Sequence, residues 1–98
     1  MPGLNTDAQI AVVAQNNVAS QTILAEDGQR QGATVYNNTA SVLYLLLGDN
    51  SGAGASSTVF TLAMAAQSYY EVPFEYLGII TGIWAAAGAG TANVTSIQ

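Results

Sequence analysis

The segment SVLYLLLGDNSGAGASSTVFTLA, residues 41–63, joins two apolar runs through a loop of small residues. The first run, residues 41–47, is continuously apolar rather than alternating, which is typical of a strand that is fully buried. Residues 48–57 are rich in Gly, Ser and Asp and predict a loop. The second run, residues 58–63, alternates as a strand with two different faces does. The segment therefore predicts two strands joined by a long loop.

The same pattern continues on both sides of this segment. Further β-rich runs are separated by turn signals at intervals of about 8 to 12 residues, and no helical period is long enough for a domain-sized helix. The expected additional strands are residues 18–25, 33–39, 69–72, 77–84 and 92–97. Residues 18–98 therefore predict an all-β domain, either a single small antiparallel β-sandwich of jelly-roll-like form or a small barrel.

The first 17 residues differ from the rest of the chain. A turn-like start, MPGLNTD, precedes the short apolar patch AQIAVVAQNN. Such a segment fits a weak helix, an edge strand of the sheet, or an extended N-terminal arm that orders on a partner, and we favour the arm or the edge strand. In both cases Ile10, Val12 and Val13 are its apolar contact residues.

The composition indicates a protein that lies against other proteins. Its 98 residues have room for one domain. Half of them are hydrophobic and only 7% are charged, against about 25% in ordinary soluble proteins. The exterior must therefore consist largely of small and neutral polar residues, which lose little hydration energy when a partner docks.

The charge balance argues against nucleic-acid and membrane partners. The net charge is -5, and Arg30 is the single cation. Phosphate contacts require several Lys or Arg, and an acidic protein is repelled by anionic lipid surfaces. The longest mostly apolar run, residues 77–89, is too short to cross a bilayer. The N-terminus lacks a basic region, so we do not expect a secretory signal.

The residue inventory argues against catalysis. The chain contains neither Cys nor His, so thiolate nucleophiles, common zinc sites and His-based proton relays are absent. Glu71 and Glu75 flank Pro73, but four positions along an extended strand span about 13 Å. Glycosidase carboxyl groups lie about 5–5.5 or 6.5–9.5 Å apart. We predict no enzyme, no catalytic residue, no cofactor and no metal site, and we interpret these acids as solvated or as partners of Arg30.

Aromatic residues concentrate in YYEVPFEYLGIITGIW, residues 69–84. Tyr69 and Tyr70 are adjacent, so in a strand one points inward and the other outward. Trp84 ends an apolar run and is expected in the core. Outward tyrosines can stack on sugar rings or anchor a protein interface, and the scarcity of charge favours the protein interface.

The run from Arg30 to Trp84 resembles a group of small tailed-phage virion proteins. Its elements are an Arg-x-Gly that opens a strand ending in an Asn turn, a Leu-Tyr strand that closes on Gly, a Tyr-Glu-x-Pro corner, and then Tyr-x-Gly and Gly-x-Trp. The positions that carry the resemblance are Arg30, Gly32, Asn37, Leu43, Tyr44, Gly48, Tyr70, Glu71, Pro73, Tyr76, Gly78, Gly82 and Trp84. They span a little over half of the chain, and the first 17 residues and the lysine-free composition depart from the pattern.

The resemblance implies a β-sandwich that decorates, or cements, a phage capsid. Such a protein binds the major capsid protein on the outer surface of the virion, is assembled in the host cytoplasm, and typically forms a homotrimer. It bridges adjacent capsomers and stabilises the head against internal DNA pressure. The alternatives are a β-module of a tail, neck or fibre, and a carbohydrate-binding module that uses exposed tyrosines. We expect the contact surface to include Ile10, Val12, Val13, Arg30, Tyr69, Tyr70, Glu71, Phe74 and Tyr76.

Overall fold

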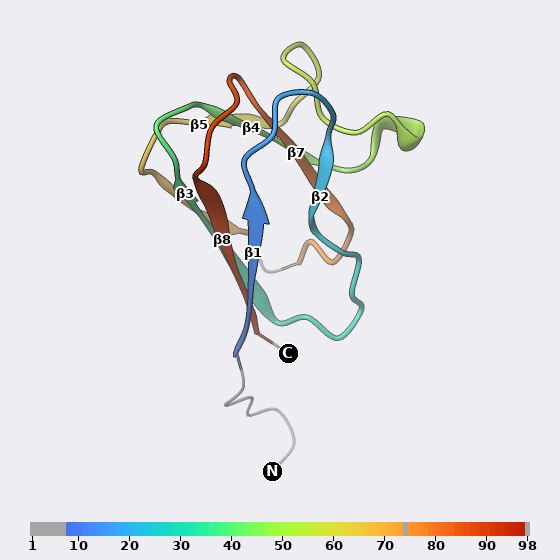
Figure 1. Cartoon of the computed structure of the whole chain (residues 1–98). Coiled ribbons are helices and arrows are strands. Elements are labelled where there is room, and N and C mark those ends of the chain that lie inside the picture. Colours follow the sequence, from blue (N-terminus) through green and yellow to red (C-terminus); the bar gives the residue numbers. More distant parts are fainter. Residues whose placement is uncertain (1–7, 74, 98) are drawn as a thin grey trace.

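A computed structural model describes residues 8–73 and 75–97 and contains eight strands (Figure 1). The strands are β1 (Ala8–Ala14), β2 (Gln21–Leu24), β3 (Gly32–Asn38), β4 (Leu43–Leu47), β5 (Leu62–Met64), β6 (Tyr69–Val72), β7 (Ile80–Trp84) and β8 (Thr91–Ile97). A 3₁₀ turn at Asn50–Gly52 interrupts the loop between β4 and β5. Within the described ranges, no helix has the length and apolarity needed to span a bilayer.

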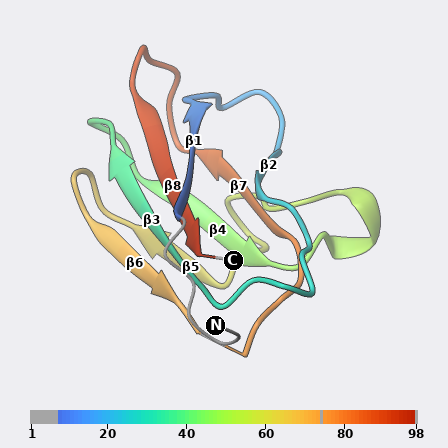
Figure 2. The same cartoon turned by 90° about the horizontal axis from the view of Figure 1, so that it is seen from below.

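The strands form two four-stranded antiparallel sheets. Sheet A has the order β1-β8-β3-β6, and sheet B has the order β2-β7-β4-β5. The chain forms one long hairpin whose turn is the loop after β4. Its two arms pair, from the turn outward, as β4·β5, β3·β6, β2·β7 and β1·β8. This hairpin is wound so that its strands alternate between the sheets (Figures 1 and 2). Such winding is the eight-stranded jelly roll. The predicted all-β sandwich is therefore confirmed, in its jelly-roll form rather than as the closed alternative.

The core lies between the sheets and is filled from alternate positions of each strand. The largest apolar side chains with almost no exposed surface are Trp84, Leu43, Leu45, Ile80, Val35 and Val94. Trp84 is thus a core residue, as predicted. β8 shows the underlying pattern most clearly, because every second residue from Ala92 to Ser96 is buried. The interior is therefore built from the period-2 pattern of the sequence.

β4 differs in detail from the prediction of a strand that is fully buried. Leu43 and Leu45 are buried between the sheets, whereas Tyr44 and Leu46 are only half-buried on the outer face of sheet B. Tyr44 is partly covered there by Phe60, with ring centroids 5.0 Å apart and planes tilted by 43°. The continuous apolar run therefore reflects a strand whose second face is covered by the loop that follows it.

Asn37 forms a polar centre inside the sandwich, where the sequence suggested a turn. It lies in β3 and is completely buried. Its side-chain oxygen accepts hydrogen bonds from the Trp84 indole N–H (3.1 Å) and the Thr39 hydroxyl (2.7 Å). Its amide donates to the main-chain oxygens of Ser41 (2.8 Å), Met64 (3.2 Å) and Ala65 (3.0 Å). This single side chain therefore links both sheets.

The N-terminal segment is an edge strand over its described part. All seven residues of β1 are in register with β8, from the pair Ala8 and Ile97 to the pair Ala14 and Thr91. Of the alternatives for residues 1–17, the structure therefore shows the edge strand for residues 8–14. Residues 1–7 of the expected arm lie outside the described residues.

Candidate protein-binding face

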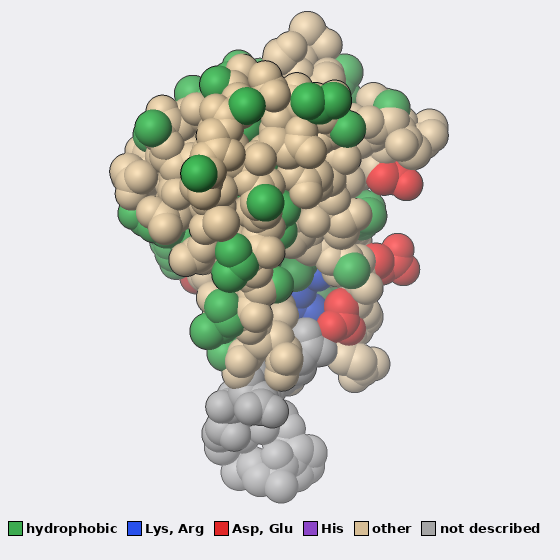
Figure 3. Space-filling model, in the orientation of Figure 1, with side chains coloured by type: hydrophobic (Ala, Val, Ile, Leu, Met, Phe, Trp, Pro, Cys, Tyr) green, Lys and Arg blue, Asp and Glu red, His purple; other side chains and the backbone are tan. Residues whose placement is uncertain are grey.

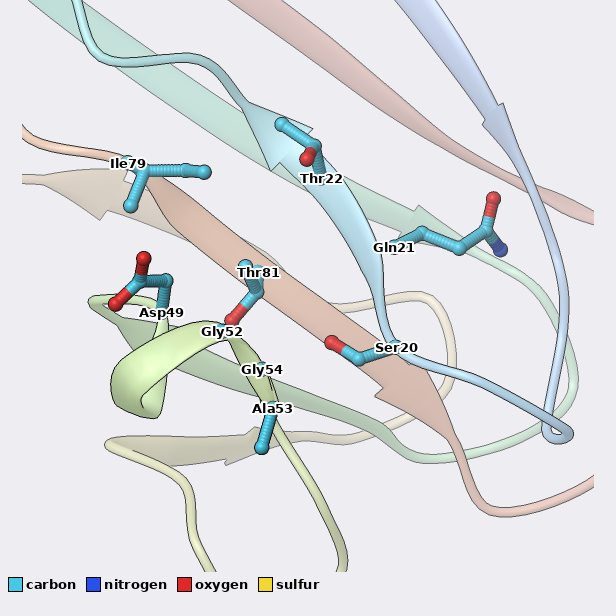
Figure 4. A pocket seen from close by; sticks show the side chains of 9 residues that line it. All are labelled: Ser20, Gln21, Thr22, Asp49, Gly52, Ala53, Gly54, Ile79 and Thr81. Atoms are coloured by element: carbon cyan, nitrogen blue, oxygen red, sulfur yellow. The ribbon is translucent and has the colours of Figure 1, made fainter.

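The loop between β4 and β5 covers part of the outer face of sheet B, over β7 and β4. Figure 4 shows Ser20 and Thr81 pointing towards this loop, whereas Gln21 points away from it. The Thr81 hydroxyl donates a hydrogen bond to the Gly48 main-chain oxygen (2.9 Å), and the Ser20 hydroxyl accepts one from the Ala55 N–H (3.0 Å). The loop is thereby fastened to both β2 and β7.

The glycines of this loop allow it to lie so close to the sheet. Gly54 has a φ of +74°, and a Cβ at this position would overlap the Ser20 side chain. Gly48 and Gly52 also have φ values in the left-handed region, +145° and +95°, where residues with a side chain are strained. The Gly-rich composition of residues 48–57 is therefore required by the loop's role as a cover.

The outer face of sheet A has no comparable cover among the described residues. Alternation along the four strands determines which side chains point outward, and the strand register places them in rows. One row is Val12, Asn93, Tyr36 and Tyr69, and the next is Ile10, Thr95, Thr34 and Glu71. We call the outward side chains of β1, β8, β3 and β6 the outer face of sheet A.

This face is apolar at one edge, neutral and polar in the centre, and aromatic at the other edge. Ile10 and Val12 are 72% and 62% exposed on β1, and Tyr69 is 62% exposed on β6. Between them lie the half-buried threonine, asparagine and tyrosine side chains of β8 and β3. Such a surface offers both apolar area and hydrogen-bonding groups without a cluster of ions.

Charged side chains are almost absent from the outer face of sheet A. Among the described acids only Glu71 lies on it, at the β6 edge. The others are in the segments between strands, at Glu26, Asp27, Asp49 and Glu75. In Figure 3 the surface over β1 and β8 is accordingly green and tan, with most of the red carboxylates along the right-hand side. A partner can dock on this face with little loss of ion hydration.

The structure brings four of the predicted contact residues together on this face. These residues are Ile10, Val12, Tyr69 and Glu71. Sequence reasoning missed the central side chains Thr34, Tyr36, Asn93 and Thr95. The sequence feature that could have identified them is the strict alternation of residues 32–38 and 91–97, where every second side chain must point outward.

Three other predicted contact residues point inward or are tied to the chain itself. Val13 and Tyr70 pack against the core, because each follows an outward-pointing neighbour in its strand. The Tyr76 ring also packs against the core, and its hydroxyl donates to the Ile79 main-chain oxygen. Val13, Tyr70 and Tyr76 are thus half-buried against the core, and their part in an interface stays a prediction. Phe74 lies outside the described residues.

Arg30 is a buried structural residue, and its part in an interface stays a prediction. Its side chain is only 4% exposed. The guanidinium donates hydrogen bonds to the main-chain oxygens of Ala25 (2.9 Å), Tyr76 (2.9 Å) and Gly78 (3.0 Å). These carbonyls take the place of the carboxylate partner that the sequence suggested. The planar fork of donors is well suited to converging carbonyl groups.

The inward tyrosines make the stability dependent on pH in the alkaline range. Burial raises the pKa of Tyr70 above its ordinary value of 10.0. Burial also raises the pKa of Tyr76; nearby Arg30 lowers it, whereas Asp49 and Glu26 raise it further. In each case the folded state retains the phenol proton at a pH where the unfolded chain has lost it.

We therefore expect the stability contributed by these neutral tyrosines to be present below pH 10 and to be lost as the pH rises above 10. Urea unfolding midpoints measured between pH 8 and pH 11 test this, and the decrease should be smaller in Tyr70→Phe than in the unchanged chain. Equal decreases in the two proteins would contradict the contribution of Tyr70.

No group of three Cys, His, Asp or Glu side chains gathers to hold a metal ion within residues 8–73 and 75–97. The residues that carry the phage resemblance serve largely to build the fold, because Arg30 contacts the Tyr76 and Gly78 backbone and Asn37 bonds Trp84.

No protein-family model, curated protein or solved structure matches this chain.

Proposed function

We propose that this chain is a structural protein of a tailed-phage virion, a capsid decoration protein that binds the outer surface of the head through the outer face of sheet A. The observation that carries this proposal is the contrast between the two outer faces. One is partly covered by the chain's own loop, and the other combines exposed Ile10, Val12 and Tyr69 with a nearly uncharged centre. The resemblance of residues 30–84 to phage virion proteins is the reason for choosing a phage head as the binding partner in this proposal.

The partner in this proposal is the major capsid protein, and the mechanism is mechanical. Four strands spaced about 4.8 Å apart and seven residues of about 3.4 Å give the face roughly 450 Å² of projected area. A standard interface buries about 800 Å² on each partner. One face is therefore modest by itself, and firm attachment comes from several copies acting together across adjacent capsomers. Bridged capsomers resist the outward pressure of packaged DNA.

The charge distribution supports a position on the outside of the particle. The net charge of -5 disfavours contact with packaged DNA or with anionic membranes. Because most of the described acids lie between strands and off the binding face, they remain exposed after docking and repel other acidic particles. A protein of this kind needs no reaction chemistry, which fits a chain that has no His, Cys or Lys to act as a base.

The jelly-roll winding is compatible with this role and does not prove it. Viral capsid domains and lectins both use this architecture. Fold alone does not determine function, so the proposal depends on the composition of the outer face.

Thr95→Lys tests the proposed binding face. Thr95 lies on β8, next to Thr34 and near the middle of the outer face of sheet A. A lysine there must be desolvated when the face docks. We expect at least ~10-fold weaker binding to heads assembled without the protein, which corresponds to ~1.4 kcal/mol. Co-sedimentation of purified protein with such heads measures the affinity.

Thr22→Lys is the matched control, because Thr22 is exposed on sheet B and is in register with Thr81 rather than with any strand of sheet A. Its affinity should equal that of the unchanged chain. Heads without the protein should also release DNA at a lower temperature than heads saturated with it. If the unchanged chain does not bind heads, or if both lysine variants bind equally well, the proposed face is wrong.

Tyr36 and Tyr69 favour a second candidate, a carbohydrate-binding module. They are directly opposite each other on β3 and β6 and both point outward, whereas the other two tyrosines considered for sugar stacking, Tyr70 and Tyr76, pack against the core. Tyr36 and Tyr69 therefore form a small platform of two adjacent rings. A glycan array distinguishes the candidates, since a decoration protein gives a flat response and a sugar-binding module gives selective signals.

A further inference from the structure

The sandwich has four edge strands, and three of them carry features that oppose further strand pairing. β5 has only three residues, and β2 has four with a register break between Thr22 and Leu24. β6 has four residues, includes the charged Glu71 and is followed by Pro73. Short length, bulges, charges and proline are the usual protections of a sheet edge.

β1 lacks all of these protections. It has seven residues, AQIAVVA, without charge, proline or glycine, and its register with β8 is continuous. An edge of this kind is a template for pairing with another strand. Its outward side chains include Ile10 and Val12, two of the most exposed large apolar residues described.

The hydrogen-bond pattern shows which backbone groups of β1 remain available. The Gln15 N–H donates to the Gly90 oxygen (3.0 Å), which places Gln15 at a hydrogen-bonded position of the ladder. Since these positions alternate in an antiparallel pair, Gln9, Ala11 and Val13 bond to β8. The main-chain groups of the even-numbered residues therefore face away from β8. Consistently, the Ala14 oxygen accepts a hydrogen bond from the Gln21 side chain of a different strand (2.8 Å).

This arrangement is self-complementary. If a second β1 lies antiparallel to the first with a two-fold axis at Ala11, all seven residues are in register. Ile10 is then opposite Val12 of the second copy, and Ala8 is opposite Ala14 of the second copy. The facing residues are those whose N–H and C=O groups point away from β8, of which the Ala14 oxygen also accepts the Gln21 side-chain bond. No like charges meet. Any other register about a two-fold axis pairs fewer residues.

We infer that β1 is the self-association edge of this protein and that two copies join through it as a two-fold dimer with one continuous eight-stranded sheet. The dimer differs from the homotrimer that the resemblance implies. It joins two outer faces of sheet A into one of roughly 900 Å², comparable to one side of a standard interface. The inference does not depend on the capsid as partner. Because the edge contact is narrow, we expect the dimer population to rise with protein concentration.

Disulfide trapping tests the register directly, because the chain has no cysteine of its own. In the dimer Ala11 faces Ala11 of the second copy at a position without hydrogen bonds between the copies, where Cα atoms are about 4.5 Å apart. This separation permits a disulfide, which requires about 4.4–6.8 Å. Ala11→Cys should therefore form a covalent dimer under mild oxidation at protein concentrations where the noncovalent dimer is populated.

Ala8→Cys is the matched control on the same strand. In the dimer the two residues at position 8 are offset by six positions along the strands, a distance of about 20 Å. Ala8→Cys should therefore remain uncross-linked. Both alanines are exposed, and circular dichroism verifies that each variant is folded. Equal cross-linking of the two variants, or no cross-linking of Ala11→Cys, would overturn the proposed register.

Charge pairing and mass provide an independent check. Because residue 10 faces residue 12 of the second copy, the double variant Ile10→Glu with Val12→Lys should still dimerise. The double variant Ile10→Lys with Val12→Lys should bind itself at least 10-fold more weakly. Sedimentation velocity over a range of concentrations should show monomer and dimer for the unchanged chain. A trimer, or a monomer at every concentration, would overturn the inference. Failure to bind heads with intact cross-linking would instead reject only the capsid proposal.

Discussion

Replacing Asn37 by alanine is expected to remove at least a third of the stability of this protein. The substitution leaves the Trp84 indole N–H without its buried acceptor and removes the side-chain donor from the Ser41, Met64 and Ala65 carbonyls. Each buried polar group left unsatisfied costs about 1–3 kcal/mol. We therefore expect a loss of about 5 kcal/mol, whereas a domain of this size has a total of about 5–15 kcal/mol.

Asn38→Ala is the natural control for this experiment. Asn38 is the next residue of β3 and is exposed, so its replacement should change the free energy of unfolding by less than about 0.5 kcal/mol. Urea unfolding followed by tryptophan fluorescence measures both variants, and Trp84 is the single tryptophan. If Asn37→Ala lost no more stability than Asn38→Ala, Asn37 would not be the polar centre of the sandwich.

Replacing Arg30 by methionine should loosen one end of the sandwich. Methionine retains much of the apolar stem but removes the donors to Ala25, Tyr76 and Gly78. A hydrogen bond from a charged donor contributes about 1.5–3 kcal/mol, and these carbonyls are only partly buried, so water can replace some of the bonds. We expect a net loss of about 3 kcal/mol.

Hydrogen exchange measured by mass spectrometry should locate the effect of Arg30→Met. Protection should decrease in residues 25–31 and 75–79, which the guanidinium holds together, and should be retained in β3 and β8. Gln29→Met is a matched control, because Gln29 is exposed in the same turn and its side chain has no described hydrogen bond. Uniform loss of protection throughout the chain would show that Arg30 does not act locally.

Local patterns in the sequence identified the strands well. All seven predicted runs from residue 18 onward overlap a strand, although several strands are shorter than expected. Residues 58–61 belong to the loop rather than to β5, and residues 18–20 precede β2. Alternation also predicted that Tyr69 and Tyr70 point in opposite directions. It could not show which of them points outward, because that depends on which face of sheet A meets sheet B.

The interior polar residues could not be predicted in this way. Arg30 bonds to residues 46 and 48 positions away, and Asn37 bonds to Trp84 47 positions away. A single cation in an acidic chain has the pattern of a surface residue, and an Asn-Asn pair has the pattern of a turn. Only the folded chain brings together the carbonyl and indole groups that make burial of these side chains favourable.

The sequence by itself determined the secondary-structure elements and the surface chemistry of this protein. These are short period-2 strands, a glycine-rich loop, and a surface almost without ions or proton-transfer groups. These properties follow from residue type and local alternation, so they need no knowledge of distant contacts. The tertiary structure alone decided which face remains open. The loop between β4 and β5 folds over sheet B. The long hairpin winds into a jelly roll with β1 beside β8, and β1 therefore becomes the unprotected edge of sheet A.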